Sequence, residues 1–100
     1  MVCKFITVTV TPGYREDFLS RQRIWNEAMS RQPGFVDVSI ATDPTRPDRI
    51  CILIQFDSHA DLDRFMNDVH DDLAEQTKIS ETYSAIEVKI LNVIETVKPC

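Results

Sequence analysis

The chain has 100 residues, of which 43% are hydrophobic, and its formal net charge is −5 at pH 7. This length predicts one domain over residues 1–100, and the acidic balance argues against nucleic acid or an anionic membrane as a partner. No run approaches ~18 apolar residues, so we expect no membrane span. The three cysteines lie far apart, and no basic-then-apolar leader is present. We therefore predict a cytoplasmic protein without a disulfide framework.

The first part of the chain predicts a strand, a helix and a second strand. Residues 2–10 alternate between two faces and are rich in β-branched side chains, which is typical of a strand. Proline and glycine at 12–13 end it. Residues 14–32 place apolar side chains at helical spacing, and the Pro-Gly pair at 33–34 ends that helix. Residues 35–41 alternate again and predict the second strand.

The middle of the chain predicts a central strand followed by a second helix. After a turn at 42–48 that contains two prolines, residues 49–56 are apolar on both faces, which indicates a strand covered on both sides. Ser58 is a candidate N-cap of the next helix. The apolar stripe of that helix runs over residues 62–73 at helical spacing.

The end of the chain predicts a loop and a long last strand. Residues 76–82 are polar and predict the loop, and residues 83–97 predict the strand. The apolar phase shifts at Leu91 and Val93, which predicts a bulge there or a strand that changes partner.

The predicted order βαββαβ is the ferredoxin-like pattern of the α+β class. It predicts a four-stranded antiparallel sheet with two helices on one face. The other face still carries apolar residues of the third and fourth strands, and a second copy of the chain is the simplest cover for them. We therefore predict a homodimer, with residues 91–97 at its interface.

Several short motifs resemble a known family and together cover most of the chain. The chain resembles the dimeric α/β-barrel proteins related to antibiotic-biosynthesis monooxygenases, and within them the YdbC-like bacterial branch. The most specific motifs are Phe-Met-x-x-Val-His-Asp at 65–71 and Thr-Tyr-Ser-x-Ile at 82–86. Further matches are Phe18, Gln22, Trp25, the Gly-Phe pair at 34–35, and residues 51–53. Many relatives have a tryptophan after the core of the third strand, where this chain has Phe56 and Asp57.

This resemblance implies two sheets that face each other in a dimer, with a pocket between each sheet and its helices. The wider superfamily includes cofactor-independent oxygenases of polyphenols, haem-degrading enzymes, cyclases and isomerases. We therefore expect a pocket for a small apolar or aromatic ligand. The YdbC-like branch adds no assigned reaction to this expectation.

His70 is the candidate catalytic residue. It flanks the apolar stripe of the second helix, four residues after Met66 and three before Leu73. An imidazole that faces a pocket there can act as a general acid or base near neutral pH. The alternative is a half-exposed histidine that only packs against its neighbours.

Four further residues are candidates for ligand binding. Trp25 can form a pocket wall or stack on an aromatic ligand, although it fits a plain core role equally well. Gln22 and Asn26 can each donate a hydrogen bond to a carbonyl or phenol, or can simply be solvated. Tyr83 opens the last strand and can donate its hydroxyl to a ligand, or can pack at the strand edge.

No metal site or bound cofactor is predicted. His59 and His70 are eleven residues apart, about three helical turns, which is too far to share an ion along one helix. The acidic residues near His70 are typical of a solvated helix face. No Ser-His-Asp order, glycine-rich phosphate loop or Cys-x-x-Cys motif is present.

Two classes of function remain open. The first is a small monooxygenase, isomerase or cyclase that acts on a compact aromatic or polyketide-like molecule. In that enzyme His70 moves a proton, Trp25 and a neighbouring amide position the ring, and the substrate supplies the electrons. The second is a non-catalytic module that binds a small apolar ligand, for example in a stress response.

Overall fold

The computed structural model describes residues 1–100 and confirms the predicted βαββαβ order. The second helix is divided into α2, a π-helical segment η1 and α3, and a 3₁₀ helix, η2, precedes the last strand. The elements are β1 (Val2–Val10), α1 (Arg15–Ser30), β2 (Phe35–Asp43), β3 (Arg46–Phe56), α2 (His59–Phe65), η1 (Met66–His70), α3 (Asp71–Thr77), η2 (Ile79–Thr82) and β4 (Tyr83–Asn92).

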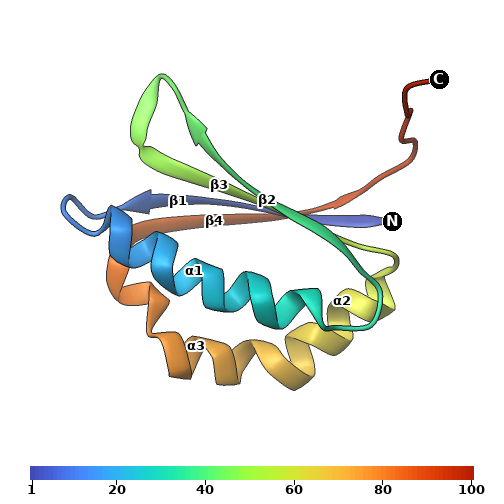
Figure 1. Cartoon of the computed structure of the whole chain (residues 1–100), viewed down its shortest axis with the longest axis horizontal. Helices are drawn as coiled ribbons and strands as arrows, with labels where there is room; N and C mark the ends of the chain where they lie inside the picture. The colour runs from blue at the N-terminus through green and yellow to red at the C-terminus, as the bar shows by residue number, and fades with distance from the viewer.

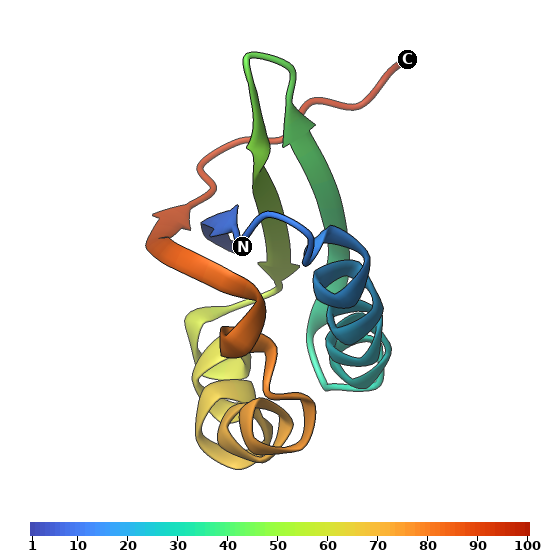
Figure 2. The ribbon, with the colours of Figure 1, turned by 90° about the vertical axis from the view of Figure 1, so that its left-hand side faces the viewer.

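The four strands form one antiparallel sheet in the order β2-β3-β1-β4. All helices lie on one face of this sheet, and the opposite face is bare (Figures 1 and 2). The fold is therefore ferredoxin-like, as predicted. No helix combines the length and the apolar character that a membrane span requires.

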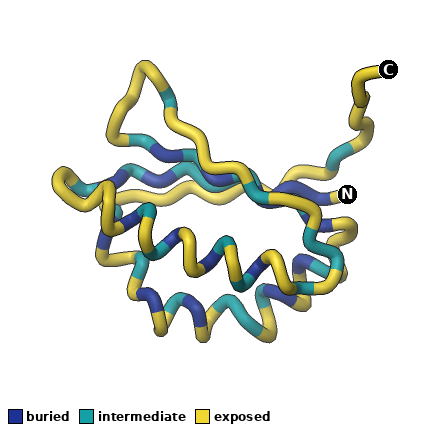
Figure 3. Tube along the Cα trace, in the orientation of Figure 1, coloured by how far each residue is buried: buried dark blue, intermediate teal, exposed yellow.

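The core lies between the sheet and the helices, because alternate residues of β1 and β3 point toward α1 and the second helix. Val2 and Val8 of β1 are each 1% exposed, and Phe56 at the end of β3 is fully buried. The buried positions follow the inner sides of the helices and the central strands in Figure 3, whereas β4 is exposed along its length.

The sequence predicted one continuous second helix, and the π-helical segment η1 corrects this. Phe65 and Leu73 are both buried although they are eight residues apart. In an uninterrupted α-helix such residues lie about 80° apart around the axis, since each residue turns the helix by about 100°. A π turn holds one residue more than an α turn, so one turn of each brings both side chains to the core. The same segment begins with Met66 and ends with His70, one π turn apart.

The ends of the helices follow the predicted signals. Ser58 is the N-cap of α2, and its Oγ accepts a hydrogen bond from the Asp61 backbone N–H at 3.2 Å. Gly34 follows α1 with φ +80°, a conformation that favours glycine. The predicted loop at 76–82 is instead the last turn of α3 and the helix η2.

The strand boundaries differ from the prediction at three places. The predicted turn at 42–48 is shorter, because β2 and β3 continue as a hairpin as far as Asp43 and Arg46. The predicted bulge at Leu91 is wrong, since the register shift between β1 and β4 lies beside Thr9. The last strand also ends at Asn92, not at residue 97, because its pairing with β1 ends at Val2. Beyond it only the Val93 N–H donates a hydrogen bond, to the Met1 carbonyl oxygen at 3.0 Å.

Candidate functional site

A cavity of about 170 Å³ lies between the sheet and the helices, and 13 of its 17 lining residues are hydrophobic. This volume is below the roughly 300–1,000 Å³ of sites for drug-sized ligands, which favours a compact molecule. The cavity is bordered by the half-exposed edge strand β4, through Ile86 and Val88. Four of the predicted site residues line it together: Gln22, Trp25, His70 and Tyr83. Asn26 does not line it.

His70 lies at the end of the π-helical segment, and its ring packs against Trp25 in a T-shaped arrangement. The two ring centroids are 5.1 Å apart and the ring planes cross at 70°. His70 Nδ1 lies 3.1 Å from Asp71 Oδ1, and the Asp71 side chain is 96% exposed. This contact favours the tautomer with the proton on Nδ1, because a carboxylate can only accept. His70 Nε2 is then the nitrogen that can take up a proton.

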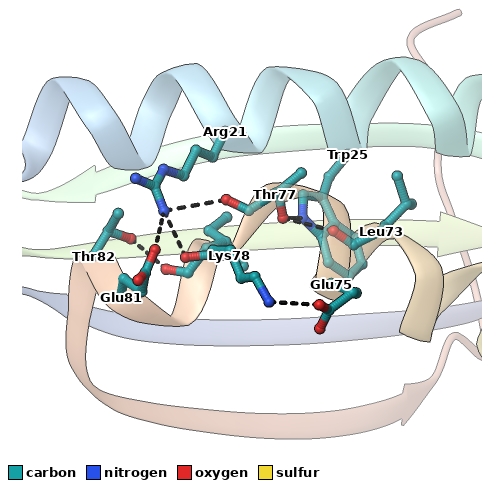
Figure 4. A network of polar contacts seen from close by, with 9 residues as sticks. Arg21, Trp25, Leu73, Glu75, Thr77, Lys78, Glu81 and Thr82 are labelled. Carbon is teal, nitrogen blue, oxygen red and sulfur yellow. Dashed lines mark hydrogen bonds and ion pairs between the residues drawn. The ribbon is translucent and has the colours of Figure 1, made fainter.

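Trp25 contributes an apolar surface to the cavity and no hydrogen bond. Its indole N–H already donates to Thr77 Oγ1 at 2.9 Å, and the Thr77 hydroxyl donates to the Leu73 carbonyl oxygen at 2.7 Å (Figure 4). The ring is thus fixed to α3, and it is only 9% exposed. Trp25 can therefore hold a ring system by packing, in a rigid position.

Arg21 fixes α1 against the end of α3 beside this tryptophan. Its guanidinium donates to the carbonyl oxygens of Thr77 at 3.1 Å and Lys78 at 2.6 Å (Figure 4). It also pairs with Glu81 at 3.1 Å. Thr77 is the last residue of α3 and Lys78 is its C-cap, so a cation there stabilises the C-terminal carbonyls of the helix. The Lys78 carbonyl oxygen also accepts from the Glu81 backbone N–H at 3.0 Å. The clamp holds the two helices that carry Trp25 and His70 in one arrangement.

Gln22 and Asn26 form one amide pair, of which only Gln22 reaches the cavity. Gln22 is 5% exposed, and its Nε2 donates to Asn26 Oδ1 at 2.9 Å. Asn26 therefore orients the neighbouring amide, which leaves Gln22 Oε1 as an acceptor at the cavity wall. This differs from the prediction that either amide could meet a ligand directly.

Lys4 lines the same cavity, although it is not among the site residues predicted from the sequence. It is 7% exposed, and its ammonium contacts only Met66 Sδ, at 3.2 Å. Burial lowers the pKa of the Lys4 ammonium below its ordinary value of 10.5. A signal was present in the sequence, because Lys4 is the only charged residue on the otherwise apolar face of residues 2–10.

Replacing Lys4 with methionine is expected to stabilise the fold by about 1–4 kcal/mol at neutral pH. Methionine has a similar shape, and the replacement removes an unpaired buried charge. In the unfolded chain the lysine keeps its ordinary pKa, above the folded value. The folded wild type is therefore penalised fully below the lowered pKa, and the penalty fades as the pH rises toward 10.5. Urea unfolding of wild type and variant at about pH 7 and about pH 9.5 should show that the difference between their free energies of unfolding becomes smaller at the higher pH. A constant difference would contradict a titrating buried lysine.

The histidine at the start of the second helix takes no part in the cavity. His59 is exposed and contacts Asn92 Oδ1. No group of three or more His, Cys, Asp or Glu side chains is arranged to hold a metal ion. The cavity is lined by no carboxylate, and its titratable side chains are Lys4, His70 and Tyr83.

Comparison with known proteins now assigns the chain to a family. The family described as domain of unknown function DUF4937 matches residues 2–91. The chain belongs to this family. No curated protein matches its sequence.

Solved structures share the fold of this DUF4937 protein over nearly its whole length. SnoaB, a cofactor-independent oxygenase from Streptomyces nogalater, superposes with a TM-score of 0.83 at 18% identity, covering 98% of this chain and 97% of its own. A putative antibiotic biosynthesis monooxygenase from Deinococcus radiodurans gives 0.82 at 11% identity, covering 100% and 99%. One from Nitrosomonas europaea gives 0.80 at 17% identity, covering 95% and 100%. The fold is that of antibiotic biosynthesis monooxygenase-like proteins.

Proposed function

We propose that this DUF4937 protein is a small cofactor-independent monooxygenase that acts on a compact aromatic or polyketide-like molecule. The observation that carries the proposal is the shared cavity of His70 and Trp25, in which a fixed aromatic wall stands 5.1 Å from a histidine ring. The fold of SnoaB, a cofactor-independent oxygenase, supports this reaction class. The narrower likeness to the YdbC-like branch stays a prediction.

In the proposed reaction His70 Nε2 removes a proton from a phenolic hydroxyl or an activated ring carbon. The ring packs against Trp25, and Gln22 Oε1 can accept a hydrogen bond from a second hydroxyl of the substrate. The resulting anion is electron-rich and gives its electrons to O₂. One oxygen atom of O₂ bonds to the ring carbon, and the other leaves as water with the two hydrogens that the substrate loses. In anthrone both hydrogens come from the CH₂ group, and in a phenol one comes from the ring carbon and one from the hydroxyl. The product is a quinone.

Oxygen uptake by the purified protein tests the proposal. Two suitable probes are 1-naphthol, a two-ring phenol, and anthrone, a three-ring ketone with an acidic CH₂ group. We expect protein-dependent uptake of one O₂ per molecule and formation of 1,4-naphthoquinone or anthraquinone. Binding of both probes without uptake would overturn the oxygenase and favour the non-catalytic binding module. Conversion of a probe without O₂ uptake would favour an isomerase or cyclase.

We propose that the protein is a homodimer, in which the sheet faces not covered by helices pack against each other. On this face Phe5 pairs with Leu53, and Cys3 pairs with Leu91, which is 48% exposed. The chain then continues past β4 in an extended tail that leads away from the domain (Figure 1). Ile94 in the tail is 97% exposed. Apolar side chains so exposed in the single chain are the ones that a second copy would cover.

Replacing Ile94 with aspartate should therefore weaken the dimer at least tenfold without unfolding the chain. Leaving a buried neutral polar group unpaired costs about 1–3 kcal/mol and a carboxylate costs more, whereas about 1.4 kcal/mol already corresponds to tenfold in affinity. Sedimentation of the wild type should give about twice the 11.5 kDa chain mass. Ile24, 43% exposed on α1, offers the matched control, since Ile24→Asp lies on the helix side. A monomeric wild type would contradict the proposed dimer.

A further inference from the structure

Lys4 is a cation inside the cavity whose charge nothing in the chain balances. Its neighbours across the sheet are Ile54 and Ile90, so its side chain leaves the backbone among apolar residues. An ammonium group has three N–H donors, yet the only partner is the thioether of Met66, a weak acceptor. None of the residues that line the cavity is a carboxylate.

A buried charge without a partner is rare, because leaving water costs more than a thioether contact returns. Lysine can often extend its chain to reach solvent. Lys4 does not do so, because it lies on the central strand β1 and is only 7% exposed. The missing partner is therefore a group with a negatively charged oxygen, and the cavity is the space that can admit it.

We propose that Lys4 is the anion-binding residue of this cavity, and that its ligand is a compact aromatic molecule bearing one anionic oxygen, as a carboxylate or a phenolate. The apolar walls hold the ring, and the Lys4 ammonium donates to the anionic oxygen. This assignment rests on the proposed function, in which His70 generates such an anion by removing a proton. Lys4 then stabilises the charge in a site of low polarity, where a charge-assisted hydrogen bond is strong.

Binding of two probes of nearly the same shape tests the assignment. Naphthalene-2-carboxylate carries the anionic oxygen, and naphthalene-2-carboxamide is its neutral counterpart. Trp25 is the only tryptophan and lines the cavity, so its fluorescence reports binding, and calorimetry gives the affinity. The wild type should bind the carboxylate at least tenfold more tightly than the amide. Lys4→Met should lose this preference while its affinity for the amide stays within about twofold.

A third probe separates a carboxylate ligand from a phenolate ligand. The phenolate of 1-naphthol absorbs at longer wavelength than the phenol, so the spectrum of the bound probe shows whether it is ionised. If Lys4 stabilises a phenolate, wild type should shift bound 1-naphthol toward the ionised spectrum and Lys4→Met should not. Either result supports the assignment. A tenfold preference for the carboxylate identifies a carboxylate ligand, and the spectral shift identifies a phenolate ligand.

The matched control is Lys89→Met. Lys89 pairs with Phe5, the residue next to Lys4, but points to the bare face of the sheet. Its replacement removes one positive charge without touching the cavity and should leave all affinities unchanged. If Lys4→Met keeps the wild-type carboxylate preference and spectrum, the assignment is overturned. If the amide binds but the wild type shows neither a preference for the carboxylate nor the ionised spectrum of 1-naphthol, the assignment fails while the aromatic cavity stands. If no probe binds the wild type, both the Lys4 assignment and the aromatic cavity are contradicted.

Discussion

Replacing His70 with alanine is expected to lower the O₂-dependent oxidation rate about 100-fold or more, the range for loss of a general base. The alanine side chain cannot accept the proton, so the electron-rich anion no longer forms in the cavity. The fold should survive, since the His70 side chain is 29% exposed and its polar contact is to a solvated carboxylate. Oxygen uptake with anthrone at saturating concentration measures the effect.

The second histidine of the chain provides the control. His59 lies on the same helical stretch but is exposed and contacts Asn92, outside the cavity. His59→Ala should therefore oxidise anthrone at the wild-type rate. If His70→Ala also keeps that rate while the wild type is active, His70 is a packing residue and another group removes the proton.

Replacing Gly34 with alanine should destabilise the protein by about 3 kcal/mol. Gly34 has φ +80°, which costs an alanine about 1–2 kcal/mol. An added Cβ at position 34 would also overlap the Asp61 side chain, including the Cβ of Asp61. Rotation of the Asp61 carboxylate therefore cannot remove the overlap. Asp61 accepts from Ser58 Oγ at 2.9 Å and from Arg64 at 3.2 Å. Moving it disturbs the start of α2, and loss of a cap costs about 1 kcal/mol more.

Gly13 separates the two contributions. Its φ of +87° is nearly the same, but an added Cβ there meets nothing within 4 Å. Gly13→Ala should therefore cost only about 1–2 kcal/mol. Urea unfolding of the two variants gives the difference. Equal losses of unfolding free energy in the two variants would mean that overlap with Asp61 adds nothing to the cost at position 34.

The fold could be predicted because each element carries its own local pattern. β1 was predicted with its observed bounds, since alternation over residues 2–10 and the turn after it agree. The π-helical segment was missed because it has no local signal. The segment brings Phe65 and Leu73 closer to one line facing the core, and only the packed structure shows this alignment. The end of β4 was also missed, because it depends on where its partner strand begins.

The candidate site was predicted less completely than the fold. Helical spacing could direct Trp25 and His70 toward the sheet, and the structure places them around one cavity. Spacing alone could not show that Asn26 turns to its neighbour Gln22 and not to the cavity. Lys4 was passed over because a long side chain can reach solvent from many strand positions. Its ammonium instead contacts Met66, which lies 62 positions away in sequence.

A crystal structure of the protein with 1-naphthol bound, grown without oxygen, tests the central claim most directly. We predict that the ring lies in the cavity against Trp25, with its hydroxyl oxygen about 2.6–3.2 Å from His70 Nε2, the reach of a general base. A ring bound on the bare sheet face, or in the cavity with its hydroxyl directed away from His70, would contradict the proposed oxygenase site.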